Sequence, residues 1–83
     1  IVLIKNADAV ISIGGEIGTA IEILAAYANK KHLILFKGTG GWTDRIQKVL
    51  IDGKFLDSRK LVEVKTANNI NEIVNILKNI LGE

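Results

Sequence analysis

The sequence predicts an α/β fold in three layers, α/β/α, around a parallel sheet of at least three strands. Short apolar runs alternate with stretches of helical periodicity, strand before helix, three times over, which is typical of parallel sheets with right-handed crossovers. Hydrophobic residues make up 48% of the 83 residues and aromatic residues only 5%, which suits strands covered by helices on both faces. Clusters of glycine follow the first two predicted strands.

The first strand and helix contain the stretch around which we expect the chain to be organised. Residues 10–13 are apolar apart from Ser12 and predict a buried strand, and paired glycines follow it directly. Helical periodicity then runs from Ile17 to about Asn29. The helix face expected to pack on the sheet carries Ile17, Ala20, Ile21, Leu24, Ala25 and Ala28.

The second unit repeats this order on a smaller scale. Residues 32–36 predict another buried strand, again followed by glycines. Thr43 or Asp44 is expected to cap a short helix, with Gln47 in capping-box spacing from Asp44. Trp42 just precedes this helix and is expected to anchor it, with stacking on a base as the less favoured alternative.

The remaining segments complete the predicted fold. Residues 61–64 alternate as a half-exposed edge strand does, and Asn69 with Glu72 makes the capping-box signature of a third helix. Residues 1–5 fit either a strand or the last turn of a helix. Because the chain opens without Met and three strands are few, we expect residues 1–83 to form a single partial domain, the carboxyl-terminal half of a doubly wound fold.

Composition argues against several classes of function. Cysteine is absent and His32 is the single histidine, so we expect no disulfide, no metal site and no cofactor. The net charge of +2 comes from dispersed Lys and Arg residues, which argues against nucleic-acid binding. No apolar run approaches the roughly 20 residues that span a bilayer, so we expect no membrane association and a cytoplasmic location.

Two glycine-rich stretches carry a resemblance to a known family. These are Gly14-Gly15-Glu16-Ile17-Gly18-Thr19-Ala20-Ile21-Glu22 and Gly38-Thr39-Gly40-Gly41-Trp42. The sequence resembles the carboxyl-terminal half of the LOG-like Rossmann proteins, formerly called lysine decarboxylases, and among them a bacterial and archaeal branch of uncharacterised proteins. The similarity extends over nearly all 83 residues and implies a Rossmann-like fold.

The resemblance also implies a ligand and an activity. In catalytic members of the family the loop reads Pro-Gly-Gly-x-Gly-Thr-x-x-Glu, binds the phosphate of a nucleoside monophosphate and serves a hydrolase that releases the base. Alignment on Thr19 and Glu22 places Gly15 and Gly18 on family glycines. The resemblance therefore implies a catalytic or ribose-contacting role for Glu22.

The chain departs from the family pattern at two positions of the loop. Gly14 stands where the family has proline, and Glu16 stands where it has its second glycine. A carboxylate beside a phosphate site opposes anion binding unless it points away. Catalytic members also use an arginine from their amino-terminal half, which this sequence does not contain. We therefore expect the isolated chain not to hydrolyse nucleotides.

Both glycine clusters are predicted to face one ligand site, because they follow successive parallel strands. The predicted ligand-binding residues are Gly14, Gly15, Gly18, Thr19, Gly38, Thr39, Gly40 and Gly41. The alternative for the glycines is that they only permit tight turns. The spacing of Thr19 and Glu22 by itself favours a capping box without chemistry, a role that conflicts with ligand contact by Glu22. Backbone N–H groups at the start of a helix bind phosphate well, which favours the ligand site.

These observations predict the binding of a nucleotide or another small phosphorylated ligand at residues 14–19. The first alternative is a nucleoside 5'-monophosphate phosphoribohydrolase in the full-length protein. The second is a structural half-domain that serves oligomerisation. We also expect a homo-oligomer, a dimer or larger, in which another copy covers the open edge of strand 10–13 or the helix face of Ile17, Ile21 and Leu24.

Overall fold

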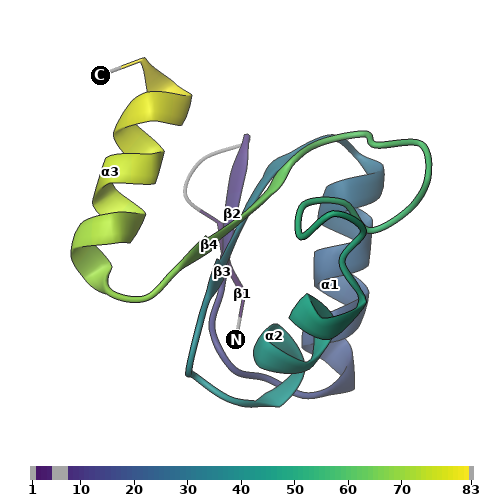
Figure 1. Cartoon of the computed structure of the whole chain (residues 1–83). Helices are drawn as coiled ribbons and strands as arrows, with labels where there is room; N and C mark the ends of the chain where they lie inside the picture. The colour runs from purple at the N-terminus through teal and green to yellow at the C-terminus, as the bar shows by residue number, and fades with distance from the viewer. Residues whose placement is uncertain (1, 5–7, 83) are drawn as a thin grey trace.

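A computed structural model gives the fold of residues 2–4 and 8–82. Its elements follow in the order β1 (Val2–Ile4), β2 (Ala9–Ser12), α1 (Ile17–Ala28), β3 (His32–Phe36), α2 (Gly41–Arg45), the 3-10 turn η1 (Ile46–Val49), β4 (Val64–Ala67) and α3 (Ile70–Leu81). The predicted alternation of strands and helices is confirmed, with β1 placed before it (Figure 1).

The four strands form one sheet in the order β1-β2-β3-β4. β2, β3 and β4 are parallel, with Val10 opposite Leu33 and Leu33 opposite Val64. The expected parallel sheet, with its strands adjacent in sequence order, is therefore confirmed. Because β2 and β3 are parallel neighbours, the loops that follow them emerge at the same edge of the sheet.

β1 corrects the expectation that the first parallel strand has an open edge. It pairs antiparallel with β2 and places Val2 opposite Ser12. β2 therefore has a hydrogen-bonded neighbour on each side, and its edge is not available to a second copy. Within the predicted segment 1–5, Ile1 and Lys5 lie outside the described residues.

Helices cover both faces of the sheet, which confirms the three-layer arrangement (Figure 1). The face under α1 and α2 holds a core of Val10, Ile23, Ala26, Tyr27, Leu33, Leu35, Ile46 and Val64. The face under α3 holds a second core of Ala9, Ile11, Ile34, Ala67, Ile73 and Leu77. Successive residues of β2 and β3 thus alternate between the two cores, as the period of a strand requires.

The buried face of α1 differs from the predicted one. Ala20, Ile23, Ala26 and Tyr27 face the sheet. Ile17, Ile21 and Leu24, predicted on that face, are 59%, 62% and 49% exposed. The reason is that α1 carries apolar residues on both sides, so helical periodicity fits either side, and tertiary packing places Ile23 and Tyr27 in the core. Ala25 and Ala28 of the predicted face are exposed as well.

The last strand and helix show one shift and one agreement. β4 begins at Val64, opposite Leu33, so the strand lies three residues later than predicted at its amino end. The N-cap of α3 is confirmed, because the Asn69 side chain accepts a hydrogen bond from the Glu72 N–H. The Glu72 carboxylate accepts in turn from the Asn68 N–H at 2.6 Å, which completes the capping of this helix end.

The longest helices, α1 and α3, have 12 residues each. Among the described residues, we find no helix with the length and apolar character needed to cross a membrane.

Hydrogen bonds of Tyr27 connect α1 to the long segment that precedes β4. The Tyr27 ring is 3% exposed, and its hydroxyl donates to the Asp57 carboxylate at 3.0 Å and accepts from the Leu61 N–H at 3.2 Å. The same segment places Leu61 against the core under α1. One phenol hydroxyl therefore satisfies both a side chain and a backbone group of a segment without regular structure.

We predict that Tyr27→Phe lowers the free energy of unfolding by about 1 to 2 kcal/mol, because the Leu61 N–H loses its acceptor while ring packing is kept. Urea unfolding followed by circular dichroism measures this difference. An unchanged free energy of unfolding would show that the hydroxyl does not hold the segment.

Candidate functional site

The two predicted glycine loops lie side by side at the carboxyl edge of the sheet. The first glycine loop, residues 14–19, follows β2 and includes the first turn of α1; the second glycine loop, residues 38–41, follows β3. Ser12 at the end of β2 is opposite Leu35 of β3, so the chain leaves both strands at the same level. The structure thus brings together the two clusters that the sequence predicts as one site.

Backbone hydrogen bonds join the two loops. The Trp42 N–H donates to the Gly15 carbonyl at 2.8 Å, and the Thr43 N–H donates to the Gly14 carbonyl at 3.2 Å. The Gly14 N–H donates to the Thr39 hydroxyl oxygen at 2.9 Å. Gly14 therefore uses both of its backbone polar groups to contact the neighbouring segment, and its part in the site is structural.

A buried pair of hydroxyl groups supports this junction. Ser12 and Thr43 are both 0% exposed, and their hydroxyl oxygens lie 2.6 Å apart. The Thr43 hydroxyl donates to the Gly14 carbonyl at 2.7 Å, so the shared proton comes from Ser12. Sequence reasoning missed this pair, although Ser12 as the polar break in an apolar strand was a signal of it.

Gly41 is the point of closest backbone approach. A Cβ atom there would lie 2.1 Å from the Gly15 carbonyl oxygen and 2.8 Å from the Gly15 nitrogen. The backbone also has φ +58°, which favours glycine. Only a residue without a side chain allows the two loops to meet in this way.

Asp44 holds the second glycine loop in shape. Its carboxylate accepts from the Gly38 N–H at 2.8 Å and from the Gly40 N–H at 2.7 Å. These two backbone bonds are the main cause of a lowered pKa for Asp44. The predicted capping role of Thr43 or Asp44 is wrong, because α2 begins earlier, at Gly41, and Asp44 reaches back to the loop instead.

The amino end of α1 has no capping side chain. Its N-cap residue is Glu16, and the Ala20 N–H makes the first bond of the helix, to the Glu16 carbonyl. Thr19 lies within the first turn and is 7% exposed, so the alternative reading of Thr19 and Glu22 as a capping box is wrong. The first N–H groups of α1 consequently keep the positive end of the helix dipole at the surface.

Gly18, Glu22 and Trp42, which the sequence analysis also singles out, have different surroundings in the structure. Gly18 is exposed, and a Cβ there would meet no atom within 4 Å. Glu22 is exposed on the second turn of α1. Trp42 packs against the core as the anchor expected from the sequence, with the Arg45 guanidinium 5.1 Å from the centre of its ring.

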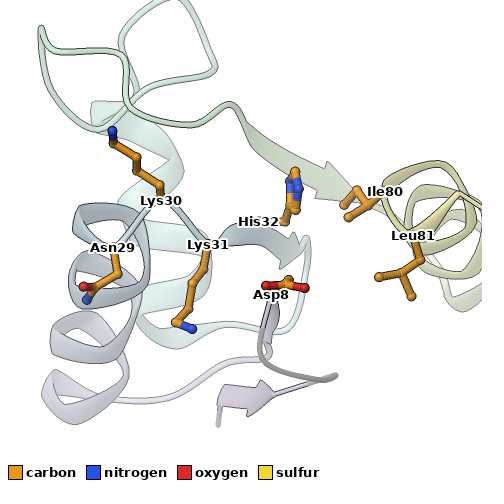
Figure 2. A pocket seen from close by; sticks show the side chains of 7 residues that line it. All are labelled: Asp8, Asn29, Lys30, Lys31, His32, Ile80 and Leu81. Atoms are coloured by element: carbon orange, nitrogen blue, oxygen red, sulfur yellow. The ribbon is translucent and has the colours of Figure 1, made fainter.

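A cavity of about 230 Å³ lies at the opposite, amino edge of the parallel strands (Figure 2). Its lining comprises Asp8, Asn29, Lys30, Lys31, His32, Ile80 and Leu81. None of these residues belongs to the predicted ligand site. His32 begins β3 there, a strand's length away from the glycine loops.

We predict that Gly41→Ala destabilises the fold by more than about 3 kcal/mol, because the backbone of the first glycine loop must move away from the new Cβ. Gly53→Ala is the matched control, since Gly53 has φ +70° but a Cβ there meets no atom within 4 Å. It should cost only about 1 to 2 kcal/mol. Equal losses in thermal unfolding would contradict the close approach.

We predict that wild type loses its stability advantage over Asp44→Asn as the solution is acidified. The folded pKa of Asp44 is lowered from 3.8, so its contribution is complete above that value and disappears as pH falls through the lower folded pKa. Urea unfolding of both proteins between about pH 7 and pH 2 measures the difference. A difference that stays constant with pH would argue against the carboxylate bonds.

Comparisons with known proteins agree with this architecture. The sequence model of the SLOG cluster4 family matches residues 1–73. The X-ray structure of TM1055, a Northeast Structural Genomics Consortium target, is 63% identical, with a TM-score of 0.87 over 90% of this chain. This chain spans 44% of the length of that one. Among curated proteins, no significant match is found.

The family match confirms the resemblance read from the glycine loops, because the SLOG superfamily includes the LOG-like Rossmann proteins. In coarse terms, it indicates a Rossmann-like protein with a nucleotide-related function. The match covers most of the sequence, from the first strand into the last helix. The chain therefore belongs to the SLOG cluster4 family.

Proposed function

We propose that this chain binds the phosphate group of a nucleotide, or of another small phosphorylated ligand, at the first glycine loop. The backbone N–H groups between Gly15 and Thr19 would hold the phosphate, because they combine a glycine turn with the amino end of a 12-residue helix. The observation that carries this proposal is the missing side-chain cap of α1.

The contrast with α3 gives this observation its weight. Both helices have 12 residues, yet α3 is capped by the side chains of Asn69 and Glu72. A helix end without a cap leaves N–H groups for water or for an anion. The same chain thus caps the amino end of α3 with side chains and leaves the amino end of α1, in the first glycine loop, without such a cap.

The second glycine loop is proposed to be a wall of the site. The N–H groups of Gly38 and Gly40 already donate to Asp44, so we assign these residues, with Thr39 and Gly41, to shaping the site rather than to holding the phosphate. This role as a wall agrees with the backbone hydrogen bonds between the first glycine loop and the residues that follow the second one.

A phosphoribohydrolase activity of a longer protein is the second candidate, and the position of Glu22 favours it. Glu22 is exposed and lies outside the first turn, so capping does not occupy its carboxylate. Its proposed role is to assist departure of the base from a nucleoside monophosphate bound at the loop. Because this chain spans 44% of TM1055, that activity is proposed for the full-length protein only.

Titration of the isotopically labelled chain with adenosine monophosphate tests the binding proposal. We expect the largest amide shifts at Gly15 to Thr19, and no comparable shifts with adenosine, which lacks the phosphate. Shifts confined to Lys30, Lys31 or Lys54 would indicate nonspecific attraction of charge and would contradict the proposal.

We predict that Gly18→Ala stabilises the fold by about 0.5 to 1 kcal/mol but weakens binding of adenosine monophosphate. The new Cβ meets no atom of the chain, so it favours the helix while occupying space that the phosphate would use. Thermal unfolding and the same amide titration measure the two effects. Unchanged affinity in the stabilised variant would place the phosphate elsewhere.

A further inference from the structure

The cavity at the amino edge of the parallel strands lies where the two helix layers meet the same edge of the sheet. α1 ends beside it at Ala28, and the last turn of α3 borders its other side. Figure 2 shows the lysines of the turn after α1 at one end, Ile80 and Leu81 at the other, and Asp8 and His32 between them. We call this space the amino-edge cavity. Its volume of about 230 Å³ is that of about eight liquid water molecules, which suits a small ligand.

The turn after α1 provides the cationic end of this cavity through its side chains. The N–H groups of Lys30 and Lys31 donate to the carbonyls of Tyr27 and Ala26 at 2.9 Å and 3.0 Å, so the backbone of the turn is occupied within the chain. Within the described part of the chain, the exposed Lys30 ammonium forms no ion pair. In Figure 2 its tip points away from Asp8, and rotation of the side chain brings it toward an anion bound at this end.

The backbone of Lys30 indicates that its side chain has a use. Lys30 has φ +58° directly after the end of a helix, where glycine is the usual residue. This conformation is unfavourable for a residue with a Cβ atom. Lys31, the next residue, supplies a positive charge near the end of the helix dipole without that cost, so the dipole alone does not account for Lys30. A role in the cavity that Lys30 lines does account for it.

Asp8 adds a negative charge beside His32. The Asp8 carbonyl accepts a hydrogen bond from the His32 N–H at 2.8 Å, which fixes the two residues next to each other. The Asp8 carboxylate can receive a ligand in addition to its interactions within the chain, because a carboxylate has about four acceptor sites. A simple anion would be repelled by Asp8, and a simple cation by Lys30 and Lys31. A zwitterion is complementary to both charges.

The last turn of α3 makes the opposite end of the cavity apolar. Ile80 is half-buried there and also borders a neighbouring cavity of about 420 Å³, which shares His32 and adds Val62. The charged residues of that neighbouring cavity, Glu63 and Lys65, pair with each other at 3.1 Å. The apolar end therefore has room for a branched aliphatic side chain and adds no unbalanced charge.

We propose that the amino-edge cavity binds a free α-amino acid with an apolar side chain. The carboxylate of the ligand binds at the lysine end, its ammonium group donates to Asp8, and its side chain packs on Ile80 and Leu81. An amino acid carries these three groups on one carbon atom, and the cavity brings the three kinds of lining residue together in a small volume. The proposal is independent of phosphate binding, because the glycine loops lie at the opposite edge of the sheet.

Amide titration of the isotopically labelled 83-residue chain with leucine tests this site. We expect leucine to shift the amides of residues 8, 29–32 and 80–81, with a dissociation constant of about 0.1 to 10 mM. Absence of these shifts at the top of this concentration range would overturn the proposal.

Three analogues of leucine separate the three contacts. Isocaproate is leucine without its amino group, isopentylamine is leucine without its carboxylate, and alanine lacks the branched side chain. Each should bind at least about tenfold more weakly than leucine, since each leaves a charge or the apolar wall without its partner. An affinity equal to that of leucine for any of the three would overturn the assignment of the ligand class.

Two variants with matched controls test the residues. Asp8→Asn should weaken leucine binding about tenfold, whereas Asp52→Asn should leave it unchanged, because the exposed Asp52 lines neither cavity. Lys30→Gly should raise thermal stability and yet weaken leucine binding several-fold. Its control is Lys60→Gly, which should leave leucine affinity unchanged, since Lys60 has a similar φ of +52° and lines neither cavity. A stabilised Lys30→Gly chain with undiminished affinity, or equal effects of the two aspartate variants, would contradict the proposed contacts.

Discussion

The contact between the two glycine loops is the constraint on which the rest of this structure depends. The N–H and carbonyl groups of Gly14 both form hydrogen bonds with residues 39–43. The buried hydroxyl groups of Ser12 and Thr43 complete the contact between the loops. The hydroxyl groups of Ser12 and Thr43 are buried, so the loss of either partner would leave an unsatisfied polar group. The position of the first turn of α1, and with it the candidate phosphate site, follows from this junction.

The elements of the fold could be predicted because their signals are local. The apolar run at residues 10–13 and the Asn69 cap each identify an element from a few neighbouring residues. The buried side of α1 could not be predicted in this way. Apolar residues lie on both sides of this helix, and tertiary packing decides which side faces the sheet. β4 begins later than the sequence predicts, because the apolar residues at 61–62 pack against the core without joining the sheet.

The site was predictable in its location but not in its internal contacts. Glycines after successive parallel strands fix where a ligand site would lie. The role of Asp44 depends on loop amides four and six residues away, whose direction is set by the glycine conformations, and it could be mistaken for a helix cap. Likewise, Thr19 and Glu22 have capping-box spacing, but the helix starts two residues before Thr19.

The Ser12 and Thr43 hydroxyl pair joins residues 31 positions apart, with all of α1 and β3 between them. A contact of this sequence separation forms late, because the intervening chain must first lose the entropy of closing a long loop. The glycine turn after β2 therefore acquires its final shape only when the crossover to β3 and α2 is complete. Local opening of residues 39–43 would release the turn as well, so the two loops should behave as one cooperative unit of the native ensemble.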